Sequence, residues 1–279
     1  MKGRGGALRA LLPEPADLVD LVETYASGIP GGGDRPFVRV NMISSLDGAI
    51  AVAGRSGGLG GTGDRLLFHA LRSLCDVVLV GAGTARVERY RQAHVPPEVQ
   101  EVRRSRGQAP VPPVAVVTQS CNLDWSSELF RGPGPRTIVL APGNTPADAL
   151  QQARVVADVM TVGAGAVDLT AAVASLHDMG LAHVLCEGGP TLNTSLAAAN
   201  LVDELCLTLS PQLAGCVGGV LLGGWLGSTG VWMARTEADG TRNFRSQPLA
   251  QLVPLRLVSL LEDESYLFLR LAAARPPQG

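Results

Sequence analysis

The amino-acid sequence predicts an α/β fold built on a mixed, mostly parallel sheet, and three observations lead to this prediction. Short apolar segments typical of buried strands alternate with amphipathic segments typical of helices, as in parallel strands joined by helices. Two of these strands end in glycine turns that open a helix. The last two apolar segments are separated only by Glu262-Asp263-Glu264, which predicts an antiparallel hairpin at the C-terminal end of the fold.

The N-terminal region precedes the first strand of this pattern. Residues 1–12 are expected to be loosely ordered, Pro13–Ala26 reads as a helix, and Gly28–Asp34 is a connector rich in glycine and proline. With 279 residues, the chain suits one large α/β domain. We therefore expect an extension with one helix over residues 1–34 and the main domain over residues 35–275.

The middle of the chain alternates strands and helices. The predicted strands are Phe37–Ile43, Asp76–Val80, Val114–Val117, Thr137–Leu140, Val156–Val162, Val184–Cys186 and Glu204–Leu209. The predicted helices are Arg65–Leu74, Pro146–Arg154, Leu169–Met179 and Thr191–Ala199. The segment Arg86–Pro113 is polar and proline-rich and predicts a long loop. Leu252–Leu260 and Ser265–Leu271 are the expected strands of the hairpin.

Composition excludes several classes of protein. The net charge is −2, without a basic stripe for nucleic acid, and no apolar run of about 18 residues predicts a membrane span. Because Lys2 is the only lysine, a P-loop for ATP is excluded. The histidines show no metal-ligand spacing, so we expect no metal. The five cysteines lack a Cys-x-x-Cys pair and predict buried free thiols in a cytoplasmic protein.

Two glycine turns are the main functional signal. Gly81-Ala82-Gly83-Thr84 follows one strand, and Gly188-Gly189-Pro190-Thr191 follows another. Glycine-rich strand ends that open helices expose backbone N–H groups, which suit phosphate. Two such turns at the ends of parallel strands are expected to hold a nucleotide from two sides.

Polar residues at other strand ends refine this interpretation. Thr118 and Ser120 follow a strand with no acidic residue beside them, which favours a cofactor with a 2′-phosphate, NADPH over NADH; an ordinary polar turn fits equally. Asp47 and Glu187 also follow strands, where a carboxylate can hold or help protonate a heterocycle. Asp47 also suits a common Asp-Gly turn, Glu187 can instead pair with an arginine, and Arg72 can bind phosphate or cap its helix.

These motifs together resemble a known family. Ser45-Leu46-Asp47-Gly48, Leu71-Arg72, the two glycine turns and Leu201-Val202-Asp203-Glu204 resemble the pyrimidine reductases of riboflavin biosynthesis, and the similarity runs from about Arg35 to Leu271. The resemblance implies a single three-layer domain similar to dihydrofolate reductase, NADPH as cofactor and a homodimer. It also implies hydride transfer to 5-amino-6-(5-phosphoribosylamino)uracil, giving 5-amino-6-(5-phosphoribitylamino)uracil.

The resemblance also implies roles for individual residues. The residues expected to contact the cofactor are Gly81, Ala82, Gly83, Thr84, Thr118, Ser120, Gly188, Gly189, Pro190, Thr191 and Leu192. Asp47 and Glu187 are the expected catalytic residues. The residues expected to contact substrate are Asn41, Arg72, Glu88, Tyr90 and Arg91.

Three departures from the family pattern stand out. The zinc deaminase motifs of the bifunctional enzymes are absent from this sequence. Asn41 stands where those enzymes often have a lysine. Glu88-Arg89-Tyr90-Arg91 stands where they often have Asp-x-Pro and a leucine, and the glycine-rich Gly215–Gly230 is a further place where the pocket is expected to differ.

Three functional hypotheses follow. The first is the NADPH-dependent aminouracil phosphate reductase, for which Arg72, Arg86, Arg89 and Arg91 are candidates to bind the phosphate. The second is a pterin reductase of the dihydrofolate reductase type, in which Asp47 holds the ring. The third is a non-catalytic NADPH-binding protein, against which the presence of both candidate carboxylates argues.

Overall fold

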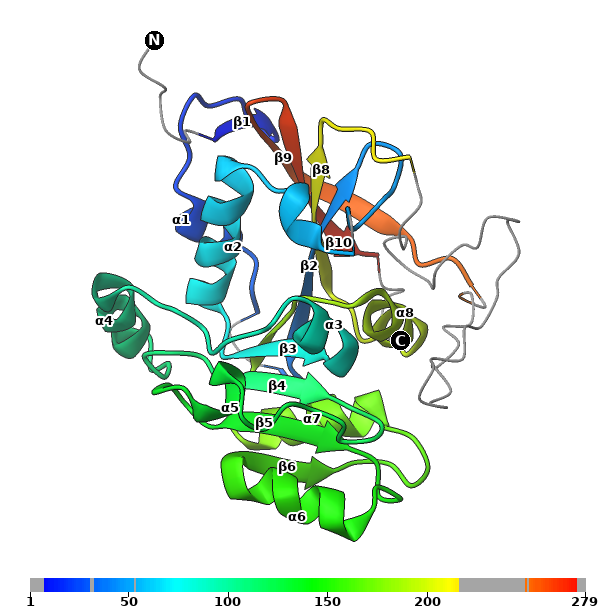
Figure 1. Ribbon diagram of the computed structural model, residues 1–279. Coiled ribbons are helices and arrows are strands. Elements are labelled where there is room, and N and C mark those ends of the chain that lie inside the picture. The colour runs from blue at the N-terminus through cyan, green and yellow to red at the C-terminus, as the bar shows by residue number, and fades with distance from the viewer. Residues whose placement is uncertain (1–7, 31–32, 53, 216–248, 250, 275–279) are drawn as a thin grey trace. The chain divides into compact units, whose positions relative to one another are not determined.

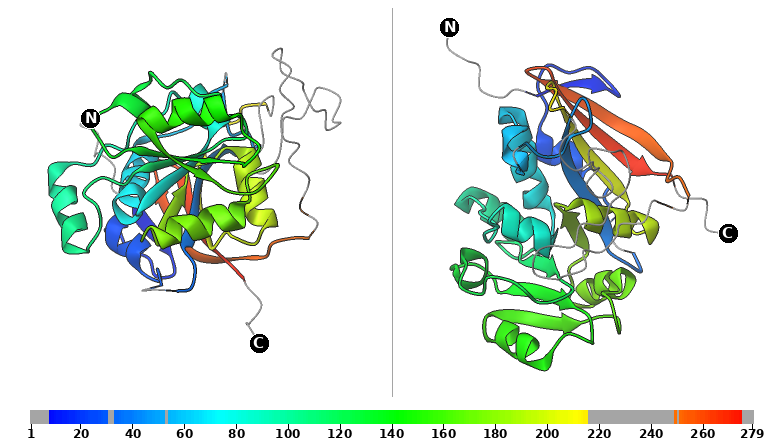
Figure 2. Two further views of the ribbon diagram at one scale, coloured as in Figure 1. Left: turned by 90° about the horizontal axis from the view of Figure 1, so that it is seen from below. Right: turned by 45° about the vertical axis from the view of Figure 1, so that its right-hand side comes forward.

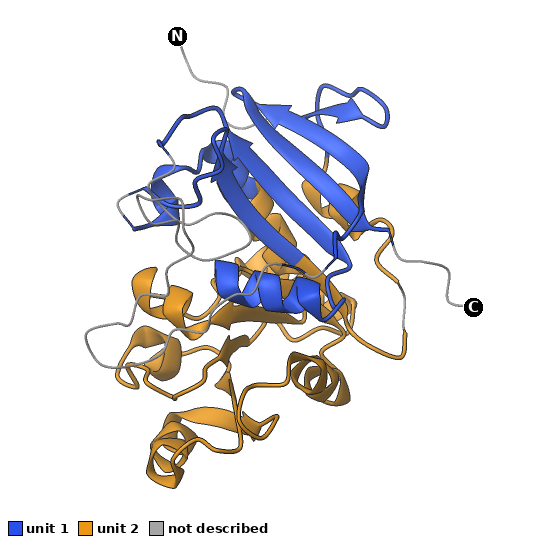
Figure 3. Cartoon of the chain, turned by 90° about the vertical axis from the view of Figure 1, so that its right-hand side faces the viewer, with its two compact units in different colours: residues 1–19, 40–66, 190–279 blue, residues 20–39, 67–189 orange. Residues whose placement is uncertain are grey.

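The computed structural model describes residues 8–30, 33–52, 54–215, 249 and 251–274. The chain forms two compact units (Figure 3). Unit 1 contains residues 1–19, 40–66 and 190–279, and unit 2 contains residues 20–39 and 67–189. Strand β2 (Phe37–Ser45) and helix α2 (Thr62–Leu74) each contribute residues to both units. Within the described ranges, no helix has the length and apolar character needed to cross a membrane.

Unit 2 is built on a parallel sheet (Figure 1). Its strands lie in the order β7-β3-β4-β5-β6. They are β3 (Val77–Gly81), β4 (Val114–Val117), β5 (Thr137–Ala141), β6 (Ala157–Thr161) and β7 (His183–Cys186). The helices are α1 (Leu21–Ala26), α3 (Ala82–Val87), α4 (Pro97–Ser105), α5 (Glu128–Arg131), α6 (Ala147–Val156) and α7 (Leu169–Asp178). Figure 2 shows α6 and α7 on opposite faces of the sheet, so its central strands are apolar on both faces.

Unit 1 contains the antiparallel part of the fold. Strands β1 (Arg9–Leu12), β9 (Leu255–Asp263), β10 (Tyr266–Ala273) and β8 (Glu204–Ser210) lie in the order β1-β9-β10-β8, with β2 next to β8. A 3₁₀ turn, η1 (Ser56–Gly58), and helix α8 (Pro190–Ala198) complete the unit. One face of the β8-β9-β10 sheet packs against the first turn of α2, where Gly63 lies against Phe268 and Asp263.

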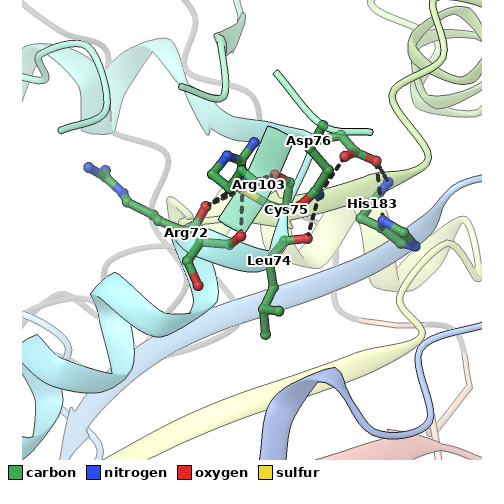
Figure 4. Close-up of polar contacts among 8 residues, drawn as sticks. Arg72, Leu74, Cys75, Asp76, Arg103 and His183 are labelled. Carbon is green, nitrogen blue, oxygen red and sulfur yellow. Dashed lines mark hydrogen bonds and ion pairs between the residues drawn. The ribbon is translucent and has the colours of Figure 1, made fainter. Parts of the chain in front are cut away.

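Buried polar groups close the end of the unit 2 sheet at which β3 begins (Figure 4). The Arg103 side chain of α4 is fully buried. Its guanidinium donates hydrogen bonds of 2.8 to 3.1 Å to four backbone carbonyl oxygens, those of Arg72, Ser73, Cys75 and Ala109. The carbonyls of Arg72, Ser73 and Cys75 lie at the C-terminal end of α2. Backbone carbonyls at such an end have no N–H partner within the helix. Arg103 therefore caps α2 from another helix.

The neighbouring contacts at this end join β3 to β7. Asp76, immediately before β3, accepts hydrogen bonds from the Gln108 amide at 2.7 Å and the His183 backbone N–H at 2.9 Å. Its second carboxylate oxygen also lies 3.2 Å from His183 Nδ1. Figure 4 shows Asp76 between β3 and His183. These bonds satisfy the polar groups at the start of both strands.

Each strand and helix predicted from residue 37 onward has a counterpart in the structure, although α3 and α5 were not predicted and Val156 ends helix α6 instead of starting a strand. The larger differences lie near the N-terminus. Arg9–Leu12 is a strand rather than loosely ordered, because the edge of β9 supplies its backbone partners. The helix expected over Pro13–Ala26 is confined to Leu21–Ala26, where the Asp20 side chain accepts a hydrogen bond from Glu23 N–H. The loop expected over Arg86–Pro113 contains helix α4, which starts at Pro97, a position that suits proline.

Other expectations concern boundaries and cysteines. The two units do not divide at residue 34, and the expected boundary there stays a prediction. The hairpin turn lies at Glu264-Ser265, both with positive φ, and not on the acidic triplet as a whole. Cys75, Cys121, Cys186 and Cys206 are buried free thiols, as predicted. Cys216 and the glycine-rich segment that follows Gly215 lie outside the described residues.

Candidate active site

The two glycine turns lie side by side in unit 2. Strands β3 and β7 are parallel neighbours, so both turns leave the sheet at the same edge. Gly81 N–H donates to the Gly188 carbonyl oxygen at 2.9 Å. Thr84 Oγ1 lies so close to Gly189 that a Cβ at this position would collide with it. The predicted juxtaposition of the turns is thus present, and Gly189 is required by close approach to Thr84.

The first turn leaves backbone N–H groups open. Gly81 precedes α3 and provides no side-chain cap. Gly83 is exposed, and no heavy atom lies within 4 Å of where its Cβ would be. The second turn leads directly into α8 of unit 1, which begins at Pro190 and has Leu192 buried in its first turn. Each turn has the backbone character expected of a phosphate cradle.

A buried charged cluster adjoins the second turn. The Arg72 guanidinium donates two hydrogen bonds of 2.7 Å to the Glu187 carboxylate, from Nε to Oε1 and from Nη2 to Oε2. The Tyr90 hydroxyl donates to Oε2 of the same carboxylate. The Arg72 and Glu187 side chains are only 11% and 3% exposed. The structure thus bears out one interpretation of Glu187, pairing with an arginine, and uses the Tyr90 hydroxyl in the same cluster.

Aromatic rings and burial set the electrostatics of this cluster. The Arg72 guanidinium carbon lies 4.1 Å from the centre of the Phe68 ring, a favourable cation–π distance. Burial lowers the pKa of Arg72, but the charge and hydrogen bonds of Glu187 outweigh it and raise that pKa. Burial and the Glu187 charge raise the pKa of Tyr90 well above its usual value. Arg72 therefore stays charged and Tyr90 stays protonated, so both remain donors to Glu187.

Sequence reasoning missed Phe68 and His69. Phe68 lies one helical turn before Arg72 on α2, and this spacing was the available signal. Burial, followed by the nearby charge of Arg72, lowers the pKa of His69. A neutral imidazole near neutral pH therefore stands beside the Arg72–Glu187 pair.

Asp47, the other predicted catalytic residue, lies in unit 1 and is already hydrogen-bonded. Its carboxylate accepts from the Ser45 hydroxyl, from Ala214 N–H at 3.1 Å and from Gly215 N–H at 2.7 Å. The Ser45 and Ala214 hydrogen bonds contribute most to lowering the pKa of Asp47 to about 2. An acid of this strength is ionised at neutral pH and accepts hydrogen bonds, and the expected catalytic role of Asp47 stays a prediction. Its contacts hold the Asp47 turn to the segment after β8.

The predicted 2′-phosphate residues follow β4. Val117 of β4 lies opposite Gly81, so Thr118 and Ser120 lie beside the first glycine turn. Thr118 is buried, and its hydroxyl accepts a hydrogen bond from Cys121 N–H at 3.1 Å, whereas Ser120 is exposed. The Arg86 guanidinium donates to the Asn122 carbonyl oxygen in the same loop at 2.9 Å. A positive charge therefore stands where the 2′-phosphate was expected.

The remaining predicted substrate residues are dispersed. Asn41 lies on β2 in unit 1, and its buried amide oxygen has no hydrogen-bond partner among the described residues. Glu88 ends α3. Arg91 pairs with Glu128 at 3.0 Å, and both side chains are mostly exposed. Unit 2 thus brings Arg72, Tyr90 and Glu187 together but leaves Arg91 outside that cluster.

Comparisons with known proteins identify the family of this chain. A family model described as the RibD C-terminal domain matches residues 36–244. The 2,5-diamino-6-ribosylamino-4(3H)-pyrimidinone 5′-phosphate reductase of Archaeoglobus fulgidus is 31% identical over 182 residues, 65% of this chain and 83% of that protein. The reductase of the same name from Methanothermobacter thermautotrophicus is 31% identical over 181 residues, 65% of this chain and 80% of that protein.

Solved structures show the same fold. A pyrimidine reductase-like protein from Corynebacterium diphtheriae has a TM-score of 0.75 at 25% identity, covering 92% of this chain and all (100%) of that chain. The riboflavin biosynthesis reductase Rib7 of Saccharomyces cerevisiae has a TM-score of 0.60 at 18% identity, covering 91% and 97% of the two chains. The predicted mixed α/β fold is therefore confirmed, and the chain belongs to the RibD C-terminal domain family, the reductases of riboflavin biosynthesis.

Proposed function

We propose that the chain uses NADPH to reduce the ribosylamino group of a 5′-phosphorylated aminopyrimidine. The observation that carries the proposal is the pair of adjoining glycine turns, joined by the Gly81–Gly188 hydrogen bond, with a buried charged cluster beside them. The family membership favours this first hypothesis over a pterin reductase and over a non-catalytic nucleotide-binding protein.

The residues present fit a nicotinamide dinucleotide phosphate. Gly83 has open space where a side chain would stand, so a phosphate can approach the N–H groups that follow Gly81. Gly188 and Gly189, with Pro190, Thr191 and Leu192, would hold the pyrophosphate from the second turn. Ser120 and Arg86 would hold the 2′-phosphate, since a phosphate pairs well with a guanidinium. NADPH supplies the hydride when bound.

The substrate end of the site would be formed by the charged cluster. Arg72 and Tyr90 together place three donors on Glu187, which fixes the orientation of its carboxylate. In unit 1, Asp47 would act by holding its turn, and the buried Asn41 oxygen would be available to a ligand donor. Unpaired buried acceptors are costly, and a ligand donor would remove that cost.

The pyrimidine ring has two candidate forms. The resemblance implies the uracil, whereas the archaeal relatives are named for the diaminopyrimidinone. The two rings differ at position 2, where an amino group replaces an oxygen. We take the diamino form as the preferred substrate, because two reductases that match the chain at 31% identity are named for it.

Assembly and location belong to the same proposal. The resemblance to a family of small-molecule biosynthesis supports a homodimer in the cytoplasm. A light-scattering measurement of the purified chain tests the first, and fractionation of the source cells tests the second.

The test of function is a set of parallel assays of NADPH oxidation. The three substrates are the diaminopyrimidinone ribosyl phosphate, its deaminated uracil form and dihydrofolate. Greatest efficiency with the first supports the proposal, and greatest efficiency with the second changes only the ring. Greatest efficiency with dihydrofolate, or turnover of none of the three, overturns it.

A further inference from the structure

Unit 1 contains a half-buried carboxyl, that of Asp64, to which the proposed function gives no role. Asp64 lies in the first turn of α2, and its side chain is turned toward strand β8, where the Thr208 hydroxyl lies beside its carboxyl. Asp64 Oδ2 also lies so close to Gly60 that a Cβ at residue 60 would collide with it. The carboxyl therefore has a defined place between β8 and the glycine segment that precedes α2.

The pairing of β8 with β10 shows which side of the sheet faces this carboxyl. Thr208 lies directly opposite Phe268, and Phe268 packs against Gly63, the residue before Asp64. Directly opposed residues of antiparallel strands point to the same face. Ser210 follows Thr208 by two residues and points to this face as well. The hydroxyls of Thr208 and Ser210 thus belong to the side of the sheet on which α2 carries Asp64.

These two hydroxyls are not satisfied by the chain itself. Thr208 and Ser210 are fully buried, and in the part of the chain that the structure describes neither hydroxyl oxygen has a hydrogen-bond partner of good geometry. A buried polar group without a partner costs free energy until one is supplied. Two buried hydroxyls and one half-buried carboxyl on the same side of the sheet are therefore suited to receive a polar ligand.

Asp64 also differs from other carboxyls of unit 1 in its partners. An arginine or a backbone N–H donates a hydrogen bond to each of Asp47, Glu204, Glu262 and Asp263. Among the described residues, Asp64 meets only the Thr208 hydroxyl and the charge of Arg65, whose guanidinium reaches the Thr62 hydroxyl instead. Burial raises the pKa of Asp64 by more than these two groups lower it. A carboxylate with so few donors gains most from a ligand that brings N–H groups.

The ligand group that suits such a carboxylate is a cyclic amidine edge, a ring N–H next to an exocyclic amino group. The two donors of this edge are parallel and match the two oxygens of one carboxylate, as those of a guanidinium do. The diaminopyrimidinone ring carries this edge at its N3–H and 2-amino groups. The uracil ring has a carbonyl at position 2, which would face a carboxylate oxygen with no hydrogen between them. A carboxylate at this place therefore distinguishes the two candidate rings.

We propose that Asp64 binds the amidine edge of the substrate ring and thereby selects a 2-amino ring over its 2-oxo form. The Thr208 hydroxyl acts as a positioning group, because it lies beside one side of the carboxyl and leaves the rest of it to the ligand. This inference rests on the proposed function, since it concerns the ring of that substrate. Pterins carry the same amidine edge, and the experiment below separates the two sources of the edge.

The substrate preference of Asp64→Asn tests the proposal. Asparagine keeps the shape of the side chain but presents one acceptor and one donor, which match the N–H and the carbonyl of the uracil edge. The ratio of kcat/KM for the diaminopyrimidinone ribosyl phosphate to that for its uracil form should therefore fall about a hundredfold. Unchanged values, or equal losses with both rings as a structural role would give, overturn the proposal. A loss confined to dihydrofolate supports the amidine contact and assigns the edge to a pterin.

Asp17→Asn is the matched control, because Asp17 is an exposed aspartate of unit 1 and the substitution is the same. Its ratio should equal that of the wild type. Thr208→Val keeps the shape of the side chain and removes the hydroxyl beside the carboxyl. It should lower kcat/KM for the diaminopyrimidinone about tenfold and leave that for the uracil form nearly unchanged. Equal losses with both rings in Thr208→Val would contradict the positioning role.

Equilibrium binding separates this inference from the proposed function, because it needs no turnover. The probes are two rings without ribose or phosphate, 2,4-diamino-6-hydroxypyrimidine and 6-aminouracil, titrated into the full chain and followed by NMR of the ligand. The wild type should bind the first at least about tenfold more tightly, and Asp64→Asn should reverse this order. Reversal without turnover of any substrate supports the amidine site and overturns only the reaction. Equal binding of both rings by the wild type overturns the inference, even where the variant does not fold.

Discussion

The two ends of the parallel sheet in unit 2 differ in how their backbone polar groups are bound. Where β3 and β7 begin, side chains close the backbone: Arg103 caps the end of α2 and Asp76 joins the strands. Where the same strands end, glycines leave backbone N–H groups open. At this second end, the Arg72 guanidinium forms an ion pair with the Glu187 carboxylate.

In this unit, the closed end is suited to stabilise the fold and the open end to bind a ligand. Ligands of parallel α/β sheets bind at the carboxyl ends of the strands, and open N–H groups there are useful only when a ligand satisfies them. At the amino end, backbone groups are already bound by side chains: Arg103 donates to four carbonyls, and Asp76 accepts from the His183 N–H. Substitutions at the first end should therefore change the free energy of unfolding, and substitutions at the second should change turnover.

The largest expected effect is at Arg103. Replacement by methionine, which keeps the length of the side chain, would leave four backbone carbonyls without their donor. Since an unsatisfied buried polar group costs about 1–3 kcal/mol, we expect Arg103→Met to lower the free energy of unfolding by about 3 kcal/mol or more. Urea denaturation measures this change.

Arg104 provides the matched control for this prediction. It is the next residue of α4 and forms an exposed pair with Glu101, which contributes little. Arg104→Met should unfold at nearly the same urea concentration as the wild type. Equal stability of the two variants would show that the amino end does not depend on the Arg103 cap.

Breaking the cluster at the other end should act on catalysis. Glu187→Gln removes the charge that Arg72 and Tyr90 hold while keeping the shape of the side chain. We expect kcat/KM to fall about a hundredfold, equivalent to about 2.7 kcal/mol, with a smaller change in NADPH affinity. Tyr90→Phe, which removes one donor, should cost about tenfold.

Glu88→Gln is the control for the cluster. Glu88 ends α3 and was predicted to contact substrate, as was Tyr90 of the same segment, Glu88-Arg89-Tyr90-Arg91. Its activity should exceed that of Glu187→Gln by a wide margin. Full activity of Glu187→Gln would show that the cluster of Arg72, Tyr90 and Glu187 takes no part in the reaction.

These residues also show which features of the site could be predicted from the sequence. Adjacent strands with glycine ends were predictable, because turns at the carboxyl ends of parallel strands meet at one edge. The ion pair of Glu187 was one of two interpretations, but its partner lies 115 residues away, a distance that local pattern cannot resolve. Tyr90 was expected to contact substrate, and only tertiary packing shows its hydroxyl on Glu187.

Sequence patterns failed where a residue lies in an environment that is unusual for its type. Arg103 is a buried cation in a segment expected to be a polar loop, because periodicity assigns arginine to solvent. On β8, a period of two correctly predicts which residues share a face, but not which face α2 covers. The alternation of buried and half-buried residues along β8 therefore became interpretable only with its pairing to β10.

A smaller effect should separate the two nicotinamide cofactors. Arg86, which binds the loop after β4, is proposed to pair with the 2′-phosphate. Arg86→Gln should raise KM for NADPH about tenfold, equivalent to about 1.4 kcal/mol, and leave KM for NADH unchanged. Arg91→Gln, which breaks only an exposed pair, is the control. Equal changes for both cofactors would place Arg86 outside the 2′-phosphate site.

The smallest effect returns to the closed end and depends on pH. The Asp76 hydrogen bond raises the pKa of His183, so its contribution is present below 6.5 and is lost as pH rises through the folded value. Burial raises the pKa of Asp76, but hydrogen bonds from His183 and Gln108 outweigh it and lower that pKa. The Asp76 contribution is present above 3.8 and is lost as pH falls through the folded value. The pair should therefore stabilise unit 2 most between these two values, by about 1 kcal/mol or less.

His183→Gln should flatten the pH dependence of the melting temperature, whereas His94→Gln, at an exposed histidine, should reproduce the wild-type profile. A His183→Gln profile that keeps the wild-type slope above pH 6.5 would assign that slope to other groups and leave the Asp76 contacts with the His183 backbone N–H and Gln108 as the closure of this end.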